Sequence, residues 1–105
     1  MSHPVLYAVI RERTSAWDWS RPMEEQKLWR EHADYMDGLV SEGFLELGGP
    51  LEDDKLVLHI VHAESPDAVR ARFEADPWHD DLLVTASIDA WTIRLDARGR
   101  AEPDD

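Results

Sequence analysis

Two segments, Val5–Ile10 and Lys55–Ala63, are apolar at nearly every position and rich in β-branched residues. Segments of this length and composition are typical of strands, and the lack of alternation with polar residues indicates that both strand faces are buried. His59 and His62 are the main polar exceptions. Any fold of this chain must therefore cover both faces of a sheet that contains these two strands.

Met23–Gly43 is predicted to be an amphipathic helix, because its apolar residues recur at the helical spacing of about 100° per residue. Met36 and Leu39 belong to the apolar stripe, and Gly43 is a natural helix end. His32 lies in the middle of the same stripe. Since the stripe should pack against a sheet, we expect the imidazole of His32 to point into the protein.

The remaining segments complete the predicted order of elements. We expect a connecting loop over Arg11–Pro22, a short strand over Phe44–Leu47, a turn at Gly48-Gly49-Pro50, a helix over Pro66–Ala75 capped by Ser65, a helical turn over Trp78–Leu83 and a last strand within Val84–Leu95. The order β-α-β-β-α-β is that of the ferredoxin-like fold, an α+β fold in which two helices cover one face of an antiparallel sheet. We expect one domain over residues 1–95 and a polar tail over residues 96–105, which lack core-forming side chains.

The ferredoxin-like arrangement leaves one face of the sheet without helices, although both long strands are apolar on both faces. A second copy of the same sheet would cover that face, and such self-complementary pairing is the commonest symmetry of protein dimers. We therefore expect a homodimer that packs sheet to sheet.

The net charge of −12 argues against two classes of partner. A nucleic-acid-binding protein normally has a basic face, and an anionic membrane surface would repel this chain. No apolar run approaches the ~20 residues of a membrane span, and Met1–Pro4 has no basic patch before an apolar region, so we expect a cytoplasmic protein. The acidity fits solubility and mutual repulsion, with a specific cationic partner as the alternative.

His32 and Asp76 are the candidate catalytic pair. Asp76 follows the second predicted helix, and in this topology both helices lie side by side on the same face of the sheet. A carboxylate within hydrogen-bond reach of an imidazole fixes its tautomer and raises its basicity, as a general acid or base requires. The alternative is a core histidine that is satisfied by a buried aspartate.

The substrate contacts expected around this pair are aromatic side chains and one stretch of backbone. Tyr7, Trp78 and Trp17 would shape an apolar pocket, and the backbone N–H groups of Gly49 and its neighbours would stabilise developing oxyanion charge. Pro50 is a further expected substrate contact.

No metal or cofactor is expected. The chain has no cysteine, which excludes thiol catalysis, disulfides and thiolate metal sites. His59 and His62 are placed to point to opposite faces of a strand, so they cannot share an ion. The Gly48-Gly49-Pro50 segment lacks the lysine and hydroxyl residues of a phosphate-binding loop.

Three motifs together give the chain a family resemblance. His32 followed by Tyr35-Met36-Asp37-Gly38-Leu39, then Gly43-Phe44-Leu45-Glu46-Leu47-Gly48-Gly49-Pro50, then Ala75-Asp76-Pro77-Trp78, resembles the YCII-like family over roughly Val5–Leu95. The resemblance implies a dimeric α+β barrel and a His-Asp dyad, with His32 and Asp76 at the matching positions. It also implies kinship with small enzymes that act on ring compounds, including a dehydrochlorinase of chlorinated hydroxyquinols and, more remotely, muconolactone isomerase.

The chain departs from shorter members of that family by an insertion around Trp17–Arg21. This segment either roofs the pocket or packs its tryptophans on the surface. The function expected is that of a cofactor-independent lyase or isomerase, in which the dyad moves a proton on a small cyclic or hydroxylated aromatic substrate. The alternatives are a non-catalytic small-molecule-binding or accessory domain, and a partner-binding module that uses the acidic surface.

Overall fold

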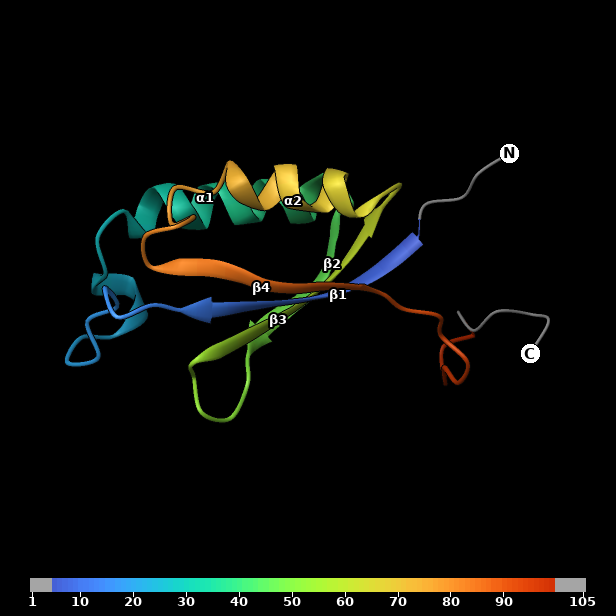
Figure 1. Cartoon of the computed structure of the whole chain (residues 1–105), viewed down its shortest axis with the longest axis horizontal. Coiled ribbons are helices and arrows are strands. Elements are labelled where there is room, and N and C mark those ends of the chain that lie inside the picture. Colours follow the sequence, from blue (N-terminus) through green and yellow to red (C-terminus); the bar gives the residue numbers. More distant parts are fainter. Residues whose placement is uncertain (1–4, 100–105) are drawn as a thin grey trace.

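The computed structural model describes residues 5–99, which contain one four-stranded sheet, two α-helices and a short 3₁₀ helix (Figure 1). The elements in chain order are β1 (Val5–Arg13), η1 (Met23–Glu25), α1 (Trp29–Ser41), β2 (Leu45–Pro50), β3 (Leu56–Ala63), α2 (Pro66–Glu74) and β4 (Leu83–Ala90). Residues 1–4, and residues 100–105 of the predicted polar tail, lie outside the described part of the chain.

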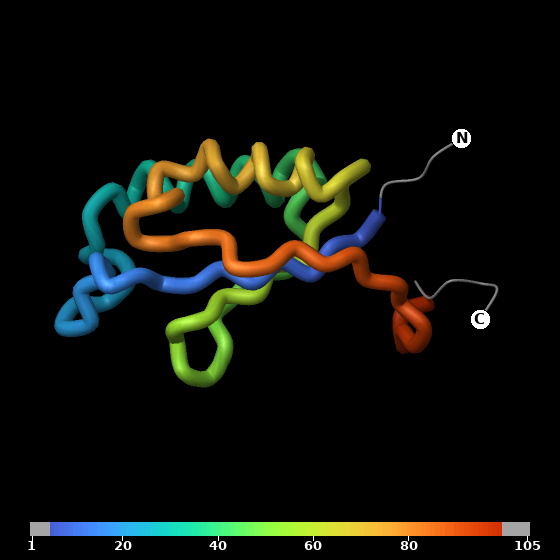
Figure 2. The backbone as a smooth tube through the Cα atoms, viewed as in Figure 1, coloured from blue at the N-terminus to red at the C-terminus, as the bar shows by residue number. Residues whose placement is uncertain are grey.

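The sheet has the strand order β2-β3-β1-β4, and all neighbouring strands are antiparallel. Both helices lie on the same side of the sheet, as the ribbon in Figure 1 and the chain trace in Figure 2 show. The helices also contact each other, because the Tyr35 hydroxyl donates to the carbonyl of Arg72, whose guanidinium pairs with Glu42. The prediction of an α+β ferredoxin-like fold is confirmed.

Strand β1 extends to Arg13, beyond its predicted end at Ile10. Arg11 and Arg13 were expected in a loop, but they continue the alternation of the strand and are buried on its helix-covered side. Burial of a guanidinium is tolerated only when the charge has partners. Arg11 pairs with Asp76, and Arg13 lies over the ring of Trp17 with 4.1 Å between its Cζ and the ring centroid.

Helix α1 begins at Trp29, and the predicted start at Met23 is wrong. Leu28 has a left-handed φ of 58° immediately before the helix, which separates α1 from the short turn η1. Gln26 between them has an extended backbone, and its side chain binds loop backbone instead of continuing a helical face. At the other end Gly43 has a φ of 84°, as expected for a glycine that terminates a helix.

The predicted turn at Gly48-Gly49-Pro50 is also wrong, because these residues belong to β2 and pair with β3. Gly48 lies opposite His59, and a Cβ on Gly48 would come within 2.9 Å of the imidazole Cδ2. The absence of a side chain at Gly48 therefore allows the imidazole of His59 to pack closely against β2. The turn itself follows β2 and contains Asp54 with a φ of 61°.

Helix α2 has the predicted start, since the Oγ of Ser65 accepts a hydrogen bond of 3.1 Å from the N–H of Ala68. The helical turn predicted over Trp78–Leu83 is wrong. Asp80 has a left-handed φ of 60°, which no helical turn allows, and the segment forms hydrogen-bonded turns that lead into β4.

Two apolar clusters fill the space between the sheet and the helices. The first comprises Tyr7, Val9, Leu39, Phe44, Leu45, Val61, Ala63, Val69 and Phe73. The second comprises Trp17, Val57, Trp78, Leu82 and Leu83, with Trp29 packed against it. Ionisable groups lie where the clusters meet: the guanidinium of Arg11 lies over the Phe73 ring, and the imidazole of His32 stacks on Trp78.

No helix of residues 5–99 lies on the other face of the sheet (Figure 1). Leu6, Ile10 and Leu58 are only partly buried there, and Leu47 is 56% exposed. The expectation of apolar residues on both faces of the long strands therefore holds, and the open face is an apolar surface. Neither α1 nor α2 combines the length and the apolar character that a membrane crossing requires.

Candidate active site

His32 and Asp76 meet between the two helices. His32 is carried by α1 and Asp76 lies just after α2, and the distance from the imidazole Nδ1 to Oδ1 of Asp76 is 2.7 Å. The side chain of Asp76 is fully buried, and that of His32 is 11% exposed. The contact predicted from the order of elements is therefore present in the fold.

Asp76 has two further partners. The Nη1 of Arg11 donates to Oδ2 at 2.8 Å, and the backbone N–H of Trp78 donates to Oδ1 at 3.1 Å. Burial opposes ionisation of this carboxyl, but the hydrogen bonds and charges of His32 and Arg11 outweigh it and lower the pKa of Asp76 below its ordinary value. Asp76 is therefore a carboxylate at neutral pH.

An ionised Asp76 decides the tautomer of His32. A carboxylate only accepts hydrogen bonds, so Nδ1 of the imidazole carries the proton that bridges the two groups. The lone pair is then on Nε2, which has no hydrogen-bond partner within residues 5–99. His32 accordingly has one nitrogen fixed in the protein and the other available to accept a proton.

Trp78 holds the imidazole from the other side. The two rings stack with their centroids 3.7 Å apart and an angle of 9° between the planes. The indole N–H donates to the carbonyl of Lys27 at 2.7 Å, and Trp17 packs edge-on against Trp78 with 5.2 Å between centroids. His32 is thus clamped between a hydrogen-bonded carboxylate and an aromatic face.

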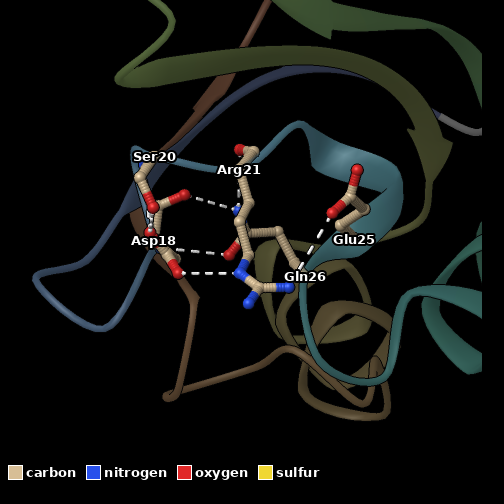
Figure 3. Close-up of polar contacts among 5 residues, drawn as sticks. All are labelled: Asp18, Ser20, Arg21, Glu25 and Gln26. Carbon is tan, nitrogen blue, oxygen red and sulfur yellow. Dashed lines mark hydrogen bonds and ion pairs between the residues drawn. The ribbon is translucent and has the colours of Figure 1, made fainter.

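Trp17 belongs to the loop between β1 and α1, and Figure 3 shows the polar contacts of the loop residues that follow it, from Asp18 to Gln26. Gln26 is buried, and its side-chain amide accepts from the N–H of Asp18 and donates to the carbonyls of Asp18 and Arg21. Arg21 also forms ion pairs with Asp18 and Glu25. These contacts fold the loop back on itself, which is why Trp17 is buried although its segment is polar.

A cleft of about 490 Å³ lies beside the His-Asp pair, between α1 and the edge of the sheet. Helix α1 contributes Trp29, His32 and Met36, and β2 and β3 contribute Gly48 and His59. Apolar groups make up most of the lining, as in small-molecule sites. Within residues 5–99, the buried polar residues of this lining are Arg13, His32 and His59.

The predicted substrate contacts are divided between this cleft and the core. Gly49, Pro50 and Trp78 line the cleft with His32. Trp17 lies behind Trp78 and lines a neighbouring cavity of about 360 Å³. Tyr7 is packed in the first apolar cluster, away from the cleft walls that residues 5–99 form.

Two buried residues of the site were missed from the sequence. Arg11 was assigned to a loop, and His59 was considered only as a metal ligand. The alternation of buried and less buried residues along β1 and β3 could have indicated both. Arg11 lies two residues after Val9, and His59 pairs with Val9 across the strands, so both lie on the same buried face as Val9. Burial lowers the pKa of Arg11, and hydrogen bonding to Asp76 opposes that change.

The surroundings of His59 decide its charge state. Burial, together with the charges of Arg11 and His32, lowers the pKa of His59 from 6.5 to about 3. His59 is therefore neutral at neutral pH. No group of three or more acidic or histidine side chains in residues 5–99 is arranged to hold a metal ion.

Comparison with known proteins agrees with the family resemblance found in the sequence motifs. No curated protein and no solved structure matches the chain. The model of the YCII-related domain matches residues 5–91, which include all four strands and both helices of the sheet-and-helix unit. The chain therefore belongs to the YCII-related family.

Proposed function

We propose that this protein is a small cofactor-independent enzyme of the lyase or isomerase type, in which His32 is the general base. Its substrate would be a small cyclic or hydroxylated aromatic compound that enters the apolar cleft. The observation that carries the proposal is the buried contact between His32 and Asp76, from which the tautomer of His32 follows. Ionised Asp76 holds Nδ1–H at 2.7 Å, and Nε2 is left without a partner within residues 5–99.

In the proposed reaction, Nε2 removes a proton from a carbon next to an electron-withdrawing group of the substrate. The C–H electron pair passes into the substrate, and His32 becomes an imidazolium that Asp76 stabilises. In an isomerisation the imidazolium returns the proton to another carbon. In an elimination the electron pair forms a C=C bond and expels a leaving group such as halide, after which His32 loses its proton to water.

Arg11 moderates the pair. Its charge keeps Asp76 ionised and buried, and it reduces the net negative charge that His32 experiences. The dyad is therefore held in a mostly buried site, which suits the removal of a proton that a neighbouring carbonyl or hydroxyl has already acidified.

The test needs no knowledge of the natural substrate. Solvent exchange of the acidic C–H of a cyclic ketone, 2-cyclohexenone, is followed in D₂O by proton NMR with wild type, His32→Gln and His62→Gln. We expect His32→Gln to lower the enzymatic exchange rate by about 10²–10⁴-fold, the usual contribution of a general base. His62→Gln, which changes a histidine outside the cleft, should retain it. Equal rates for all three proteins would refute the role of His32.

A second candidate function is a non-catalytic small-molecule-binding or accessory domain. The near-complete burial of the His32–Asp76–Arg11 group favours it, because a buried, ion-paired group can also be a structural element of a core. A ¹⁵N NMR titration distinguishes the two. A His32 ring that keeps one charge state between about pH 5 and pH 8 supports the binding function.

We also propose that two chains pack through the open faces of their sheets. The partly exposed Leu6, Ile10 and Leu58, with the exposed Leu47, provide the apolar surface that such an interface buries. The result would be a dimeric α+β barrel. A cytoplasmic location belongs to the same proposal, since the chain has no cysteine to form disulfides.

A further inference from the structure

His59 is a second imidazole in the wall of the cleft, and the proposed reaction does not use it. It is 5% exposed and lies on β3, in the sheet that forms the floor beneath α1. Its Nδ1 is buried and has no hydrogen-bond partner among residues 5–99. A ligand in the cleft cannot reach this enclosed atom, but His59 lines the cleft, so a ligand there would bind the other ring nitrogen, Nε2.

The fold makes specific room for this ring. The residue opposite it on β2 is Gly48, where any Cβ would lie 2.9 Å from Cδ2 and 3.6 Å from Nε2 of His59. On the other side the ring packs against Phe73, with 5.2 Å between centroids. These two contacts fix the position of the imidazole, and neither offers its nitrogens a hydrogen bond.

The chemistry of His59 complements that of His32. Its surroundings disfavour the imidazolium, because the ring is buried and Arg11 places a positive charge nearby. A neutral imidazole has one N–H donor and one acceptor nitrogen. It therefore suits an uncharged hydroxyl or carbonyl oxygen, whereas a carboxylate or phosphate would be better matched by a cation.

We propose that His59 is a substrate-recognition residue, which hydrogen-bonds a hydroxyl or carbonyl oxygen of the ring compound whose reacting carbon faces His32. The inference rests on the proposed function for the class of ligand. The new element is the orientation of the ligand: one of its oxygens faces His59 on the sheet, and its reacting carbon faces His32 on α1. The specificity of the cleft is then set by two imidazoles, one on each wall.

The experiment compares phenol with toluene, which has nearly the same shape but no hydroxyl group. Dissociation constants of both probes are measured by NMR titration for wild type, His59→Leu and His59→Gln. We expect His59→Leu to weaken phenol binding by about 3–10-fold, the value of one net hydrogen bond, and to leave toluene binding unchanged. His59→Gln retains a donor and should recover part of the loss.

Two further measurements keep the result independent of folding. In wild-type protein with ¹⁵N-labelled histidine, phenol should shift the ring nitrogens of His59 and toluene should not. Gly48→Ala should weaken phenol binding because its methyl group displaces the ring. The matched control is Gly38→Ala, because no atom lies within 4 Å of a Cβ at that helical position.

Several results would overturn the inference. They are an equal effect of His59→Leu on both probes, His59 resonances that phenol leaves unmoved, or no saturable binding of phenol by wild type. The outcome is separable from that of the proposed reaction. If His59→Leu loses the preference for phenol and His32→Gln keeps normal proton exchange, His59 is a recognition residue and His32 is not the base. If His59→Leu keeps the preference and His32→Gln loses exchange, His32 is the base and His59 is not a recognition residue.

Discussion

The imidazole of His32 and the indole of Trp78 lie face to face, with ring centroids 3.7 Å apart and planes inclined by only 9°. Asp76 binds both of these residues, because its carboxylate accepts one hydrogen bond from the ring of His32 and another from the backbone N–H of Trp78. One buried carboxylate therefore sets both the tautomer of the base and the position of the surface that supports it. An aromatic face also stabilises a positive charge placed over it, which favours the imidazolium formed during proton transfer.

Replacement of Trp78 should damage stability and the site together. Trp78 is 2% exposed, and Trp78→Leu should lower the free energy of unfolding by about 3–5 kcal/mol, as for other large-to-small substitutions of buried aromatic residues. Trp78→Phe keeps a ring against His32 but loses the hydrogen bond to Lys27, so about 1 kcal/mol beyond the packing loss is expected. Urea unfolding measures both. Trp19 is 56% exposed, and Trp19→Leu should change stability by no more than about 0.5 kcal/mol.

The ion pair between Arg11 and Asp76 should behave as a unit. Both side chains are fully buried, and the removal of one charge leaves the other without compensation. We expect Arg11→Met and Asp76→Asn each to lower the free energy of unfolding by about 3–5 kcal/mol. The double variant should lose less than the sum of the two, because it leaves no isolated charge. Additive losses in urea unfolding would show that the pair is not coupled.

An exposed pair serves as the control for this cycle. Arg70 contacts Asp67 at 2.9 Å, nearly the distance of the buried pair, but the side chain of Asp67 is 95% exposed. Asp67→Asn should therefore cost at most about 1 kcal/mol, the usual range for surface ion pairs. The comparison isolates the effect of burial at constant geometry.

The element order, the helix stripe and the Ser65 cap were predictable because each depends on residues close in sequence. The meeting of His32 with Asp76 was also predictable, since topology alone brings the ends of neighbouring helices together. The start of α1 was not. The apolar repeat continues back to Met23, but the side chain of Gln26 binds loop backbone and Leu28 takes a left-handed conformation, which are tertiary effects without a local pattern.

Arg11 and His59 were missed for a different reason. An arginine after an apolar run normally marks the end of a buried strand, because an unpaired guanidinium is too costly to bury. Here the compensating charge comes from Asp76, which is 65 positions away along the chain. The role of Gly48 was equally hidden, because a glycine pair before a proline suggests a turn until the ring of His59 is known to lie across from it.

Disruption of the open sheet face should convert the expected dimer into a monomer. Ile10 lies on that face in the central strand β1, and Ile10→Lys places a charge in the apolar surface that a partner sheet would cover. Light scattering coupled to size exclusion should give a dimer for wild type and a monomer for Ile10→Lys. Leu95→Lys is the control, because Leu95 is 93% exposed and lies outside the sheet. A wild-type monomer at micromolar concentration would contradict the proposed assembly.

The pH dependence of stability should carry the signature of His59. Its pKa is 6.5 unfolded and about 3 in the folded protein, so the unfolded chain binds more protons throughout the interval between those values. Stability therefore rises with pH across this window, and acidification from neutral pH should cost up to about 1.4 kcal/mol per pH unit for this group alone. Asp76 acts lower: its pKa is depressed below 3.8, so its stabilising contribution is complete above 3.8 and is lost as the pH falls further.

The two groups can therefore be separated by range. Urea unfolding between about pH 4.5 and pH 6.5 lies inside the His59 window and above that of Asp76. His59→Leu should flatten the dependence of the free energy of unfolding on pH in this range, because a side chain that cannot bind a proton removes the difference between the two states. Gly38→Ala is the control, since it changes no titratable group and its Cβ enters open space, and it should keep the wild-type slope. If His59→Leu also kept that slope, His59 would bind protons equally in both states, and its neutral form would not be what the cleft presents to a ligand.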